Sequence, residues 1–276
     1  MSDLRITRIG GPTVLLEIDG WTILTDPTFD PPGRTYAFGW GTRSRKLTGP
    51  AIEVADLPPI DAVLISHDQH GDNLDDAGRR LLPSAGAVVT THAAAGRLGV
   101  ATARGLRPWE TTVLEKEGGD SIEVTATPCR HGPPLSRPLS GAVIGFALRS
   151  PSRAGVVWIS GDTVLYEGVR EVSARLEVDV AILHLGSVRF PITGPLTYSM
   201  SATDAVGLCE RIRPRVAIPV HYDGWAHFSE GEDRVREVLT SAPTDLRERF
   251  RILDAGAPID LSSAGRSPNR PPRGST

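Results

Sequence analysis

Residues 66–73, with the sequence SHDQHGDN, place two imidazoles and two carboxylates in one short segment of the chain. They follow directly on residues 61–66, a largely apolar, β-branched run that is typical of a buried strand. Loops at the carboxyl ends of such strands often carry functional groups. The segment therefore predicts a metal site whose ligands project from a loop.

Other predicted strands also end in side chains that could do chemistry. The loops that follow them hold three further metal-competent residues: His131, Asp162 and His221. Borderline ions such as Zn²⁺ accept imidazole nitrogen and carboxylate oxygen, and catalytic sites leave one coordination position open for water. His184 also ends a predicted strand, where it could donate to a developing oxyanion or serve as a buried structural histidine.

The elements that must position these side chains begin with β-structure and continue as β/α alternation. Apolar or alternating runs between Gly, Pro and Asp turns predict strands at 4–9, 13–18, 21–25, 62–66, 87–91, 111–115, 122–127, 143–148, 156–160, 178–183, 216–220 and 250–253. Helical patterns occupy 74–82, a short stretch from 93, 165–176, 202–212 and 233–239. A run of strands followed by a few helices occurs twice along the chain. This pattern favours an α/β sandwich of two mixed sheets covered by helices.

Composition narrows the class of protein. The chain has 276 residues, 39% of them hydrophobic, which suits one enzyme-sized domain over residues 1–261. Residues 262–276 contain no large apolar residue and are rich in Ser, Pro, Gly and Arg, which predicts a disordered tail. A net charge of −3 provides no positive field for nucleic acid or an anionic membrane.

Location and redox state are also suggested by the sequence. No apolar run approaches the ~20 residues of a membrane span, and the first residues lack a signal-peptide layout. We therefore expect a cytoplasmic protein without stable membrane insertion. Cys129 and Cys209 lie far apart and form no CxxC pair, so both should be reduced thiols.

The order and spacing of the motifs resemble the metallo-β-lactamase superfamily, and within it the branch of ascorbate-6-phosphate lactonases and N-acyl phosphatidylethanolamine phospholipase D. The landmarks are LTDP at 24–27, ISH at 65–67, LD at 74–75, PCRH at 128–131, SGDT at 160–163 and PVH at 219–221. The resemblance spans most of the chain. It implies a four-layered αββα sandwich with a metal site at one edge.

The main motif departs from the family pattern His-x-His-x-Asp-His. This chain has His67-x-x-His70-x-Asp72-Asn73, which contains one inserted residue. Alignment on residues 74–75 places His70 at the second histidine, Asp72 at the aspartate and Asn73 where the last histidine is expected. Alignment on His67 would instead place an amide and a glycine at ligand positions, so the first register is preferred.

In this register the resemblance assigns two divalent ions. His67, His70 and His131 would bind one, and Asp72, Asp162 and His221 the other, with Asp162 shared. Zinc is the expected metal. An amide oxygen at Asn73 is a weaker ligand than imidazole, so the second site should bind less tightly, take a harder ion such as Mn²⁺, or bind none.

The resemblance implies a hydrolase that uses a metal-bound hydroxide on a lactone, a phosphodiester or a related ester. Asp72 would orient the hydroxide or pass its proton to the leaving group, and Asp26 would hydrogen-bond a liganding imidazole. The alternative is a non-catalytic or metal-poor member that only binds a small molecule. The partner is a small-molecule substrate in either case, and a homo-oligomer remains open.

Several neighbours could shape the substrate, although packing or surface roles are equally open for most of them. An apolar, phospholipase-like entrance could be formed by Phe38, Trp40, Trp225 and Phe228. A phosphate-binding, lactonase-like pocket could use Arg130, Arg137 or Arg189. Packing is the favoured role for Tyr222 and His227, and helix capping for the region around His92.

Overall fold

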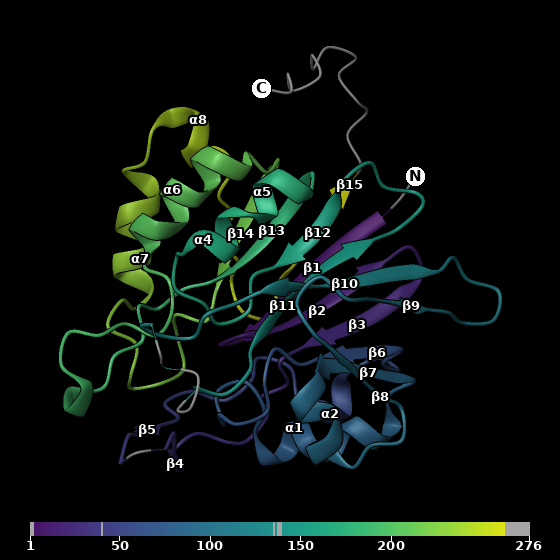
Figure 1. The fold of residues 1–276 in the computed structure, drawn as a ribbon, viewed down its shortest axis with the longest axis horizontal. Helices are drawn as coiled ribbons and strands as arrows, with labels where there is room; N and C mark the ends of the chain where they lie inside the picture. Colours follow the sequence, from purple (N-terminus) through teal and green to yellow (C-terminus); the bar gives the residue numbers. More distant parts are fainter. Residues whose placement is uncertain (1–2, 40, 135, 137–139, 263–276) are drawn as a thin grey trace.

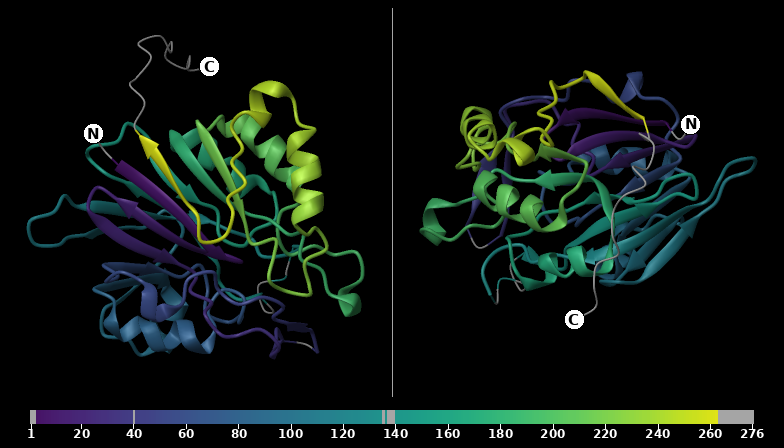
Figure 2. Two further views of the ribbon diagram at one scale, coloured as in Figure 1. Left: turned by 180° about the vertical axis from the view of Figure 1, so that it is seen from behind. Right: turned by 90° about the horizontal axis from the view of Figure 1, so that it is seen from above.

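The computed structural model describes residues 3–262 apart from 40, 135 and 137–139. Two sheets lie face to face, and helices cover their outer faces (Figure 1, Figure 2). A two-stranded hairpin, β4 (Thr35–Ala37) and β5 (Arg43–Arg45), lies beside this sandwich. Among the described residues, no helix is both long enough and apolar enough to cross a bilayer.

The first sheet has seven strands and changes from antiparallel to parallel pairing at β3. Its order is β15 (Pro258–Ser262), β1 (Asp3–Gly10), β2 (Thr13–Ile18), β3 (Trp21–Thr25), β6 (Ala62–Leu64), β7 (Ala87–Thr91) and β8 (Ala103–Leu106). Strands β3 and β6 run parallel, with Thr25 opposite Leu64. The segments that leave these two strands, including residues 66–73, therefore begin at the same edge of the sheet.

The second sheet has six strands and likewise changes along the chain from antiparallel to parallel pairing, here at β12. Its order is β14 (Val216–Val220), β13 (Val178–His184), β12 (Val156–Ile159), β11 (Ile144–Arg149), β10 (Ile122–Pro128) and β9 (Thr111–Leu114). Strands β12, β13 and β14 are parallel, and His184 is paired with Val220. Their carboxyl ends consequently deliver Asp162, His184 and His221 to one place.

Helices flank both sheets (Figure 1). The first sheet is accompanied by α1 (Asp76–Leu81) and α2 (His92–Leu98), and the second by α4 (Glu167–Arg170), α5 (Val172–Arg175), α6 (Ala202–Ile212), α7 (Glu232–Thr240) and α8 (Thr244–Arg247). Side chains determine where two of them begin. Asp75 accepts the backbone N–H of Gly78 at the start of α1, and Ser201 with Asp204 forms a capping box for α6.

Three apolar clusters hold the layers together. The largest lies between the sheets and joins Ile6 and Ile23 of the first to Phe146 and Ile182 of the second, all of them buried. A second cluster packs the six-stranded sheet against α4 to α8. A third packs the seven-stranded sheet against α1. Each such side chain contributes roughly 1.5–3 kcal/mol when it is buried. These clusters confirm the predicted sandwich of two sheets covered by helices.

Some predicted elements differ from the structure. Residues 250–253 are not a strand, because only Phe250 forms a bridge, to Ala217 of β14. The helix predicted over 165–176 is two short helices, α4 and α5, consistent with the low helix propensity of Gly168 and of the neighbouring valines. Strands β8 and β15, the β4–β5 hairpin and α8 were not expected.

Two further sequence predictions concern the ends of the chain and its thiols. Of the predicted tail, Ser262 is the last residue of β15, and residues 263–276 lie outside the described residues, as do Trp40 and Arg137. Cys129 and Cys209 are both free, as predicted.

Candidate metal centre

Three histidine rings converge at the end of β6. The Nε2 atom of His67 lies 3.0 Å from Nδ1 of His70, and Nε2 of His131 lies 3.2 Å from the same atom. All three side chains are at least nine-tenths buried. Three imidazole nitrogens facing one another at this separation are the arrangement that a divalent ion requires. The structure thus brings together the three residues that the sequence assigned to one ion.

Neighbouring groups fix which nitrogen of two rings faces the cluster. Nδ1 of His131 donates to the backbone carbonyl of Tyr198 at 2.6 Å, and Nδ1 of His67 is 3.0 Å from the Ser66 hydroxyl. A hydrogen bond at one ring nitrogen leaves the lone pair of the other free and orients the ring toward a metal. The Tyr198 carbonyl, which can only accept, therefore holds His131 in a ligand-ready tautomer, and the Ser66 hydroxyl orients the ring of His67.

Burial also favours the neutral form of two of these rings, His70 and His67. It lowers the pKa of His70 to about 4, with the nearby His131 ring acting in the same direction. Burial, followed by the proximity of His70, holds the pKa of His67 well below its usual range. Only a neutral imidazole can bind a metal, so these ligands are available throughout the neutral range.

A second cluster lies at the ends of the parallel strands of the other sheet. One ligand atom from each of Asp162, His184 and His221 lies within 4.8 Å of the others. The Oδ1 atom of Asp162 is 2.9 Å from Nδ1 of His184 and 3.5 Å from Nδ1 of His221. Asp72 joins the cluster through Oδ2, which is 3.4 Å from Nε2 of His221 and 3.1 Å from Nε2 of His227.

Several polar atoms in the second cluster are buried without a hydrogen-bond partner in the described part of the chain. They are both ring nitrogens of His221, both of His227, Nε2 of His184 and Oδ2 of Asp26. A buried polar atom left unpaired costs about 1–3 kcal/mol, so a group of them needs an explanation. A cation bound among these residues would supply one, and the donor set of imidazole and carboxylate fits a divalent transition metal.

The charges of the second cluster oppose the effect of burial. His221 is fully buried, yet the carboxylates of Asp162 and Asp72 raise its pKa to about 9. The same contacts hold the pKa of Asp72 well below its ordinary value, and the neighbouring His221 and His184 lower that of Asp162. Burial lowers the pKa of His184. Both carboxylates are therefore ionised at neutral pH and available to a cation.

Asn73, which the sequence assigned as a weak ligand, is fully buried between the two carboxylates. With its NH₂ group turned toward them, its amide donates to Asp72 Oδ1 at 3.1 Å and to Asp162 Oδ2 at 3.2 Å. In this orientation the side chain is a hydrogen-bond donor that holds both acids in place. Its role as a metal ligand stays a prediction.

Asp26 connects the two clusters, but not in the way expected. It does not hydrogen-bond a liganding imidazole. Its Oδ1 atom instead accepts the backbone N–H of Ser66 at 2.6 Å, beside His67, while Oδ2 faces Nε2 of His184 at 3.9 Å. Asp26 has φ 36° and His221 has φ 58°, conformations that are uncommon for residues other than glycine. Such strain is often found at functional sites.

Two glycines let the loops approach closely. A Cβ at Gly71, between His70 and Asp72, would lie 2.5 Å from the Tyr36 ring. Gly161, which precedes Asp162, has φ +62° and leaves no room for a Cβ next to the Ile144 carbonyl. With Tyr36 in its present place, position 71 therefore has no room for a side chain.

An aromatic cluster covers one side of the centre. The Phe38 ring lies 5.2 Å from that of His70 and 5.1 Å from that of His227, and Phe190 lies 5.5 Å from His227. Phe38 and Trp225 are buried, so the expected exposed apolar entrance is wrong for both of them. The rings form an inner wall instead.

The remaining candidates have varied positions. His227 contacts Asp72, although a packing role was favoured for it, and Tyr222 does pack in the core beneath α6 and α7. His92 is the first residue of α2, whose cap is Thr91. The guanidinium of Arg130 lies over the ring of Tyr166. The side chain of Arg189 is exposed.

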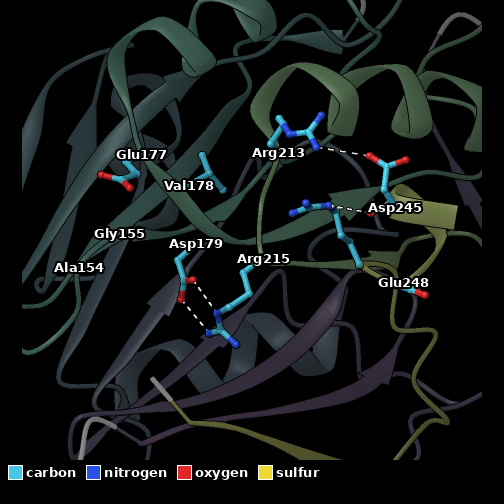
Figure 3. A pocket seen from close by; sticks show the side chains of 10 residues that line it. Ala154, Gly155, Glu177, Val178, Asp179, Arg213, Arg215, Asp245 and Glu248 are labelled. Carbon is cyan, nitrogen blue, oxygen red and sulfur yellow. Dashed lines mark hydrogen bonds and ion pairs between the residues drawn. The ribbon is translucent and has the colours of Figure 1, made fainter. Parts of the chain in front are cut away.

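Two cavities differ in their relation to the centre. One of about 580 Å³ is bordered by His131, Cys129 and Arg130 and lies beside the first cluster. Another, of about 550 Å³, lies at the far ends of the strands (Figure 3). There Asp179 forms two hydrogen bonds with Arg215, so these charges are already paired. Only the first cavity is placed to serve the metal centre.

Comparison with known proteins agrees with this geometry. Residues 21–222 match the model of the beta-lactamase superfamily domain, so the chain belongs to this superfamily and has its metallo-β-lactamase fold. Among its relatives are proteins named metal-dependent hydrolases. One from Pyrobaculum neutrophilum is 29% identical over 80% of this chain and 84% of the relative, and one from Pyrobaculum calidifontis is 30% identical over the same shares.

Solved structures give the same fold. A possible metal-dependent hydrolase from Veillonella parvula has a TM-score of 0.79 and 22% identity, over 93% of this chain and 99% of the other. An isothiocyanate hydrolase from Delia radicum gut bacteria has a TM-score of 0.77 and 20% identity, over 94% and 100%. The chain therefore stands among the metal-dependent hydrolases of the metallo-β-lactamase fold.

Proposed function

We propose that this protein hydrolyses a small-molecule ester, whether a lactone, a phosphodiester or a related compound, with one or two divalent ions, zinc first and manganese second. The observation that carries the proposal is the convergence of three buried rings, in which Nδ1 of His70 lies 3.0 Å from Nε2 of His67 and 3.2 Å from Nε2 of His131. Ring nitrogens that face one another in a buried site are expensive to bury together unless they bind a metal.

A bound divalent ion would supply an acidified water as nucleophile and would polarise the substrate oxygen. Asp72 is ionised, and its Oδ2 atom can accept a proton from the attacking water. His227, with Nε2 at 3.1 Å from that oxygen, can carry the proton onward to the leaving group. Asn73 keeps the carboxylates of Asp72 and Asp162 apart at a fixed separation through its two donated hydrogen bonds.

The surroundings favour a substrate with an apolar group beside the ester. Phe38 and Phe190 form a wall next to His70 and His227, and the cavity of about 580 Å³ at His131 has the size of small-molecule sites. Arg107 and Arg130 are among the residues that line the cavity, and their positive charge would favour a negatively charged substituent. Membership of the lactonase and phospholipase branch, a cytoplasmic location and a homo-oligomer all stay predictions.

The test is a screen of metal-free protein reloaded with zinc or manganese, against lactones, phosphodiesters and phosphonate esters with and without an anionic group. We expect activity that depends on added metal, and His70→Ala should lower kcat/KM by at least about 100-fold because even outer-shell partners of a metal are worth 10- to 100-fold. Thr240→Ala, at an exposed position of α7, is the control and should keep wild-type activity.

The alternative function is that of a non-catalytic or metal-poor member of the family that only binds a small molecule. Elemental analysis that finds no zinc or manganese after reloading would favour it. Loss of activity in the Thr240 control equal to that in His70→Ala would show that the assay reports folding rather than chemistry.

A further inference from the structure

We infer that His184 supplies the imidazole that the family motif places at position 73, so that the second ion of this chain is held by Asp162, His184 and His221. The inference rests on the proposed metal centre and specifies its second half. No motif contains His184; it is the last residue of β13, in a different sheet from residues 66–73.

Position 73 is already used for another purpose. With its NH₂ group turned toward the carboxylates, where an amide oxygen would meet only acceptors, Asn73 donates to one oxygen of Asp72 and one of Asp162, at 3.1 and 3.2 Å. An NH₂ group that donates two hydrogen bonds has no lone pair to offer a metal. If a second ion binds, its imidazole ligands must therefore come from elsewhere.

His184 has the geometry of a ligand. Its Nδ1 atom is 2.9 Å from Asp162 Oδ1, and His221 Nδ1 is 3.5 Å from the same oxygen. Ligand atoms bound to zinc at about 2.0–2.1 Å lie roughly 2.9–3.6 Å apart for bond angles between 90° and 120°. Both measured distances lie within this interval. The two imidazole rings are stacked, at a centroid separation of 5.5 Å, so both edges face the carboxylate.

A purely structural role explains less. As a hydrogen-bond donor to Asp162, His184 would satisfy one ring nitrogen, but its Nε2 and both nitrogens of His221 would form no hydrogen bond in a fully buried site, with His221 left at 3.4–3.5 Å from the carboxylates of Asp72 and Asp162. A cation among the three residues engages the His221 ring as well. His227 is a weaker candidate for the same role, because its contact is with Asp72 rather than with Asp162.

The experiment measures zinc per chain after reloading and desalting, with His184→Gln as the main variant. Glutamine keeps a donor for Asp162 but removes the ring nitrogen. We expect two zinc ions in the wild type and one in His184→Gln, with the second Kd weakened by at least about 100-fold. Asn73→Ala should still bind two, and Asn73→His in the His184→Gln background should recover the second ion.

The outcomes separate this inference from the proposed function. Two ions retained in His184→Gln, or one ion in the wild type, would overturn the inference while leaving the first cluster and the hydrolase proposal intact. Loss of the second ion in Asn73→Ala but not in His184→Gln would identify Asn73 as the ligand. No zinc in the wild type would end the proposed function itself.

A measurement on the wild type covers the case in which a variant does not fold. The chain has seven histidines, and nitrogen-15 spectra of histidine-labelled protein show which rings bind metal. We expect three rings to bind zinc with the first equivalent and two more with the second. A second equivalent that engages a single ring would overturn the inference.

Discussion

The two halves of the metal centre are built differently. In the His67–His70–His131 cluster, two of the three rings have their second nitrogen occupied, by Ser66 and by the Tyr198 carbonyl. In the Asp162–His184–His221 cluster, Nε2 of His184 and both nitrogens of His221 form no hydrogen bond among the described residues, and His221 meets Asp72 and Asp162 only at 3.4–3.5 Å. Hydrogen bonds orient the first cluster before any ion arrives, whereas the rings of the second are held less closely until one binds. We therefore expect tight binding at the first and weaker binding at the second.

The largest effect should follow removal of a ligand from the first cluster. His67→Ala removes one of three converging nitrogens and leaves the ring of His70 without its 3.0 Å neighbour. We expect the tightest zinc affinity, measured by competition with a chelator, to fall by at least about 100-fold. The matched substitution in the second cluster, His221→Ala, should leave this affinity within a few-fold of wild type. Equal losses in both variants would show that the clusters form one cooperative site.

The first cluster was predictable because its determinants are local in the sequence. An apolar strand followed by SHDQHGDN carries two ligands and their orienting Ser66 in one segment, and His131 follows directly on the end of β10. The same holds for α6, whose bounds match the prediction because Ser201 and Asp204 cap it and its apolar residues repeat at helical spacing. Local signals of this kind do not depend on the rest of the fold.

The second prediction concerns the hydroxyl that orients His67. Ser66→Ala removes the partner of Nδ1 at 3.0 Å, so the ring loses its preferred tautomer and orientation. The first zinc affinity should weaken by about 10- to 100-fold, with the second unchanged. Chelator competition again gives the measurement. Ser229→Ala, which changes a hydroxyl that bonds to the Ser187 carbonyl, is the control. An unchanged first affinity would mean that the tautomer is set by other contacts.

The second cluster was only partly predictable, because its contacts join distant segments. His227 lies beside Asp72 although 155 positions separate them in the sequence, and no spacing rule reports such a pairing. The partner of Asp26 was mistaken for the same reason, since the backbone of Ser66 comes close only after β3 and β6 pair. Asn73 could be recognised as a departure from the motif, but its position between two carboxylates required the fold.

The third prediction uses pH to separate the clusters in metal-free protein. The pKa of His70 is lowered to about 4, so between pH 4 and about 6.5 the unfolded chain binds more protons and stability falls as pH falls. The pKa of His221 is raised to about 9, so its contribution is full below about 6.5 and is lost as pH rises through 9. The melting temperature should therefore decline by several degrees on both sides of about pH 6.5.

Two variants test which histidine causes the loss of stability on each side of the pH profile. His70→Gln should reduce the acid-side loss, which His67 and His184 share because their pKa values are also lowered, and should leave the alkaline side unchanged. His221→Gln should flatten the alkaline side. An alkaline side that is unchanged in His221→Gln would contradict its assignment to His221.

The smallest effect is expected at Asp26, the residue between the clusters. Burial raises its pKa well above the usual range, which favours the neutral carboxyl in the metal-free protein, and an amide can replace a neutral carboxyl. Asp26→Asn keeps an oxygen for the Ser66 N–H and should cost less than about 1 kcal/mol of unfolding free energy, whereas Asp26→Ala leaves that N–H unpaired and should cost about 1–3 kcal/mol.

Urea denaturation of the metal-free protein measures both changes in unfolding free energy. Asp260→Asn is the control, because that carboxylate is exposed, pairs only with Arg5 among the described ion pairs, and should leave the stability close to that of the wild type. If Asp26→Asn is as destabilising as Asp26→Ala, the residue is charged in the folded protein. A negative charge on Asp26, facing His184, would then orient the second cluster before any metal binds. The two clusters would in that case differ less in their metal-free order than the buried atoms without hydrogen bonds suggest.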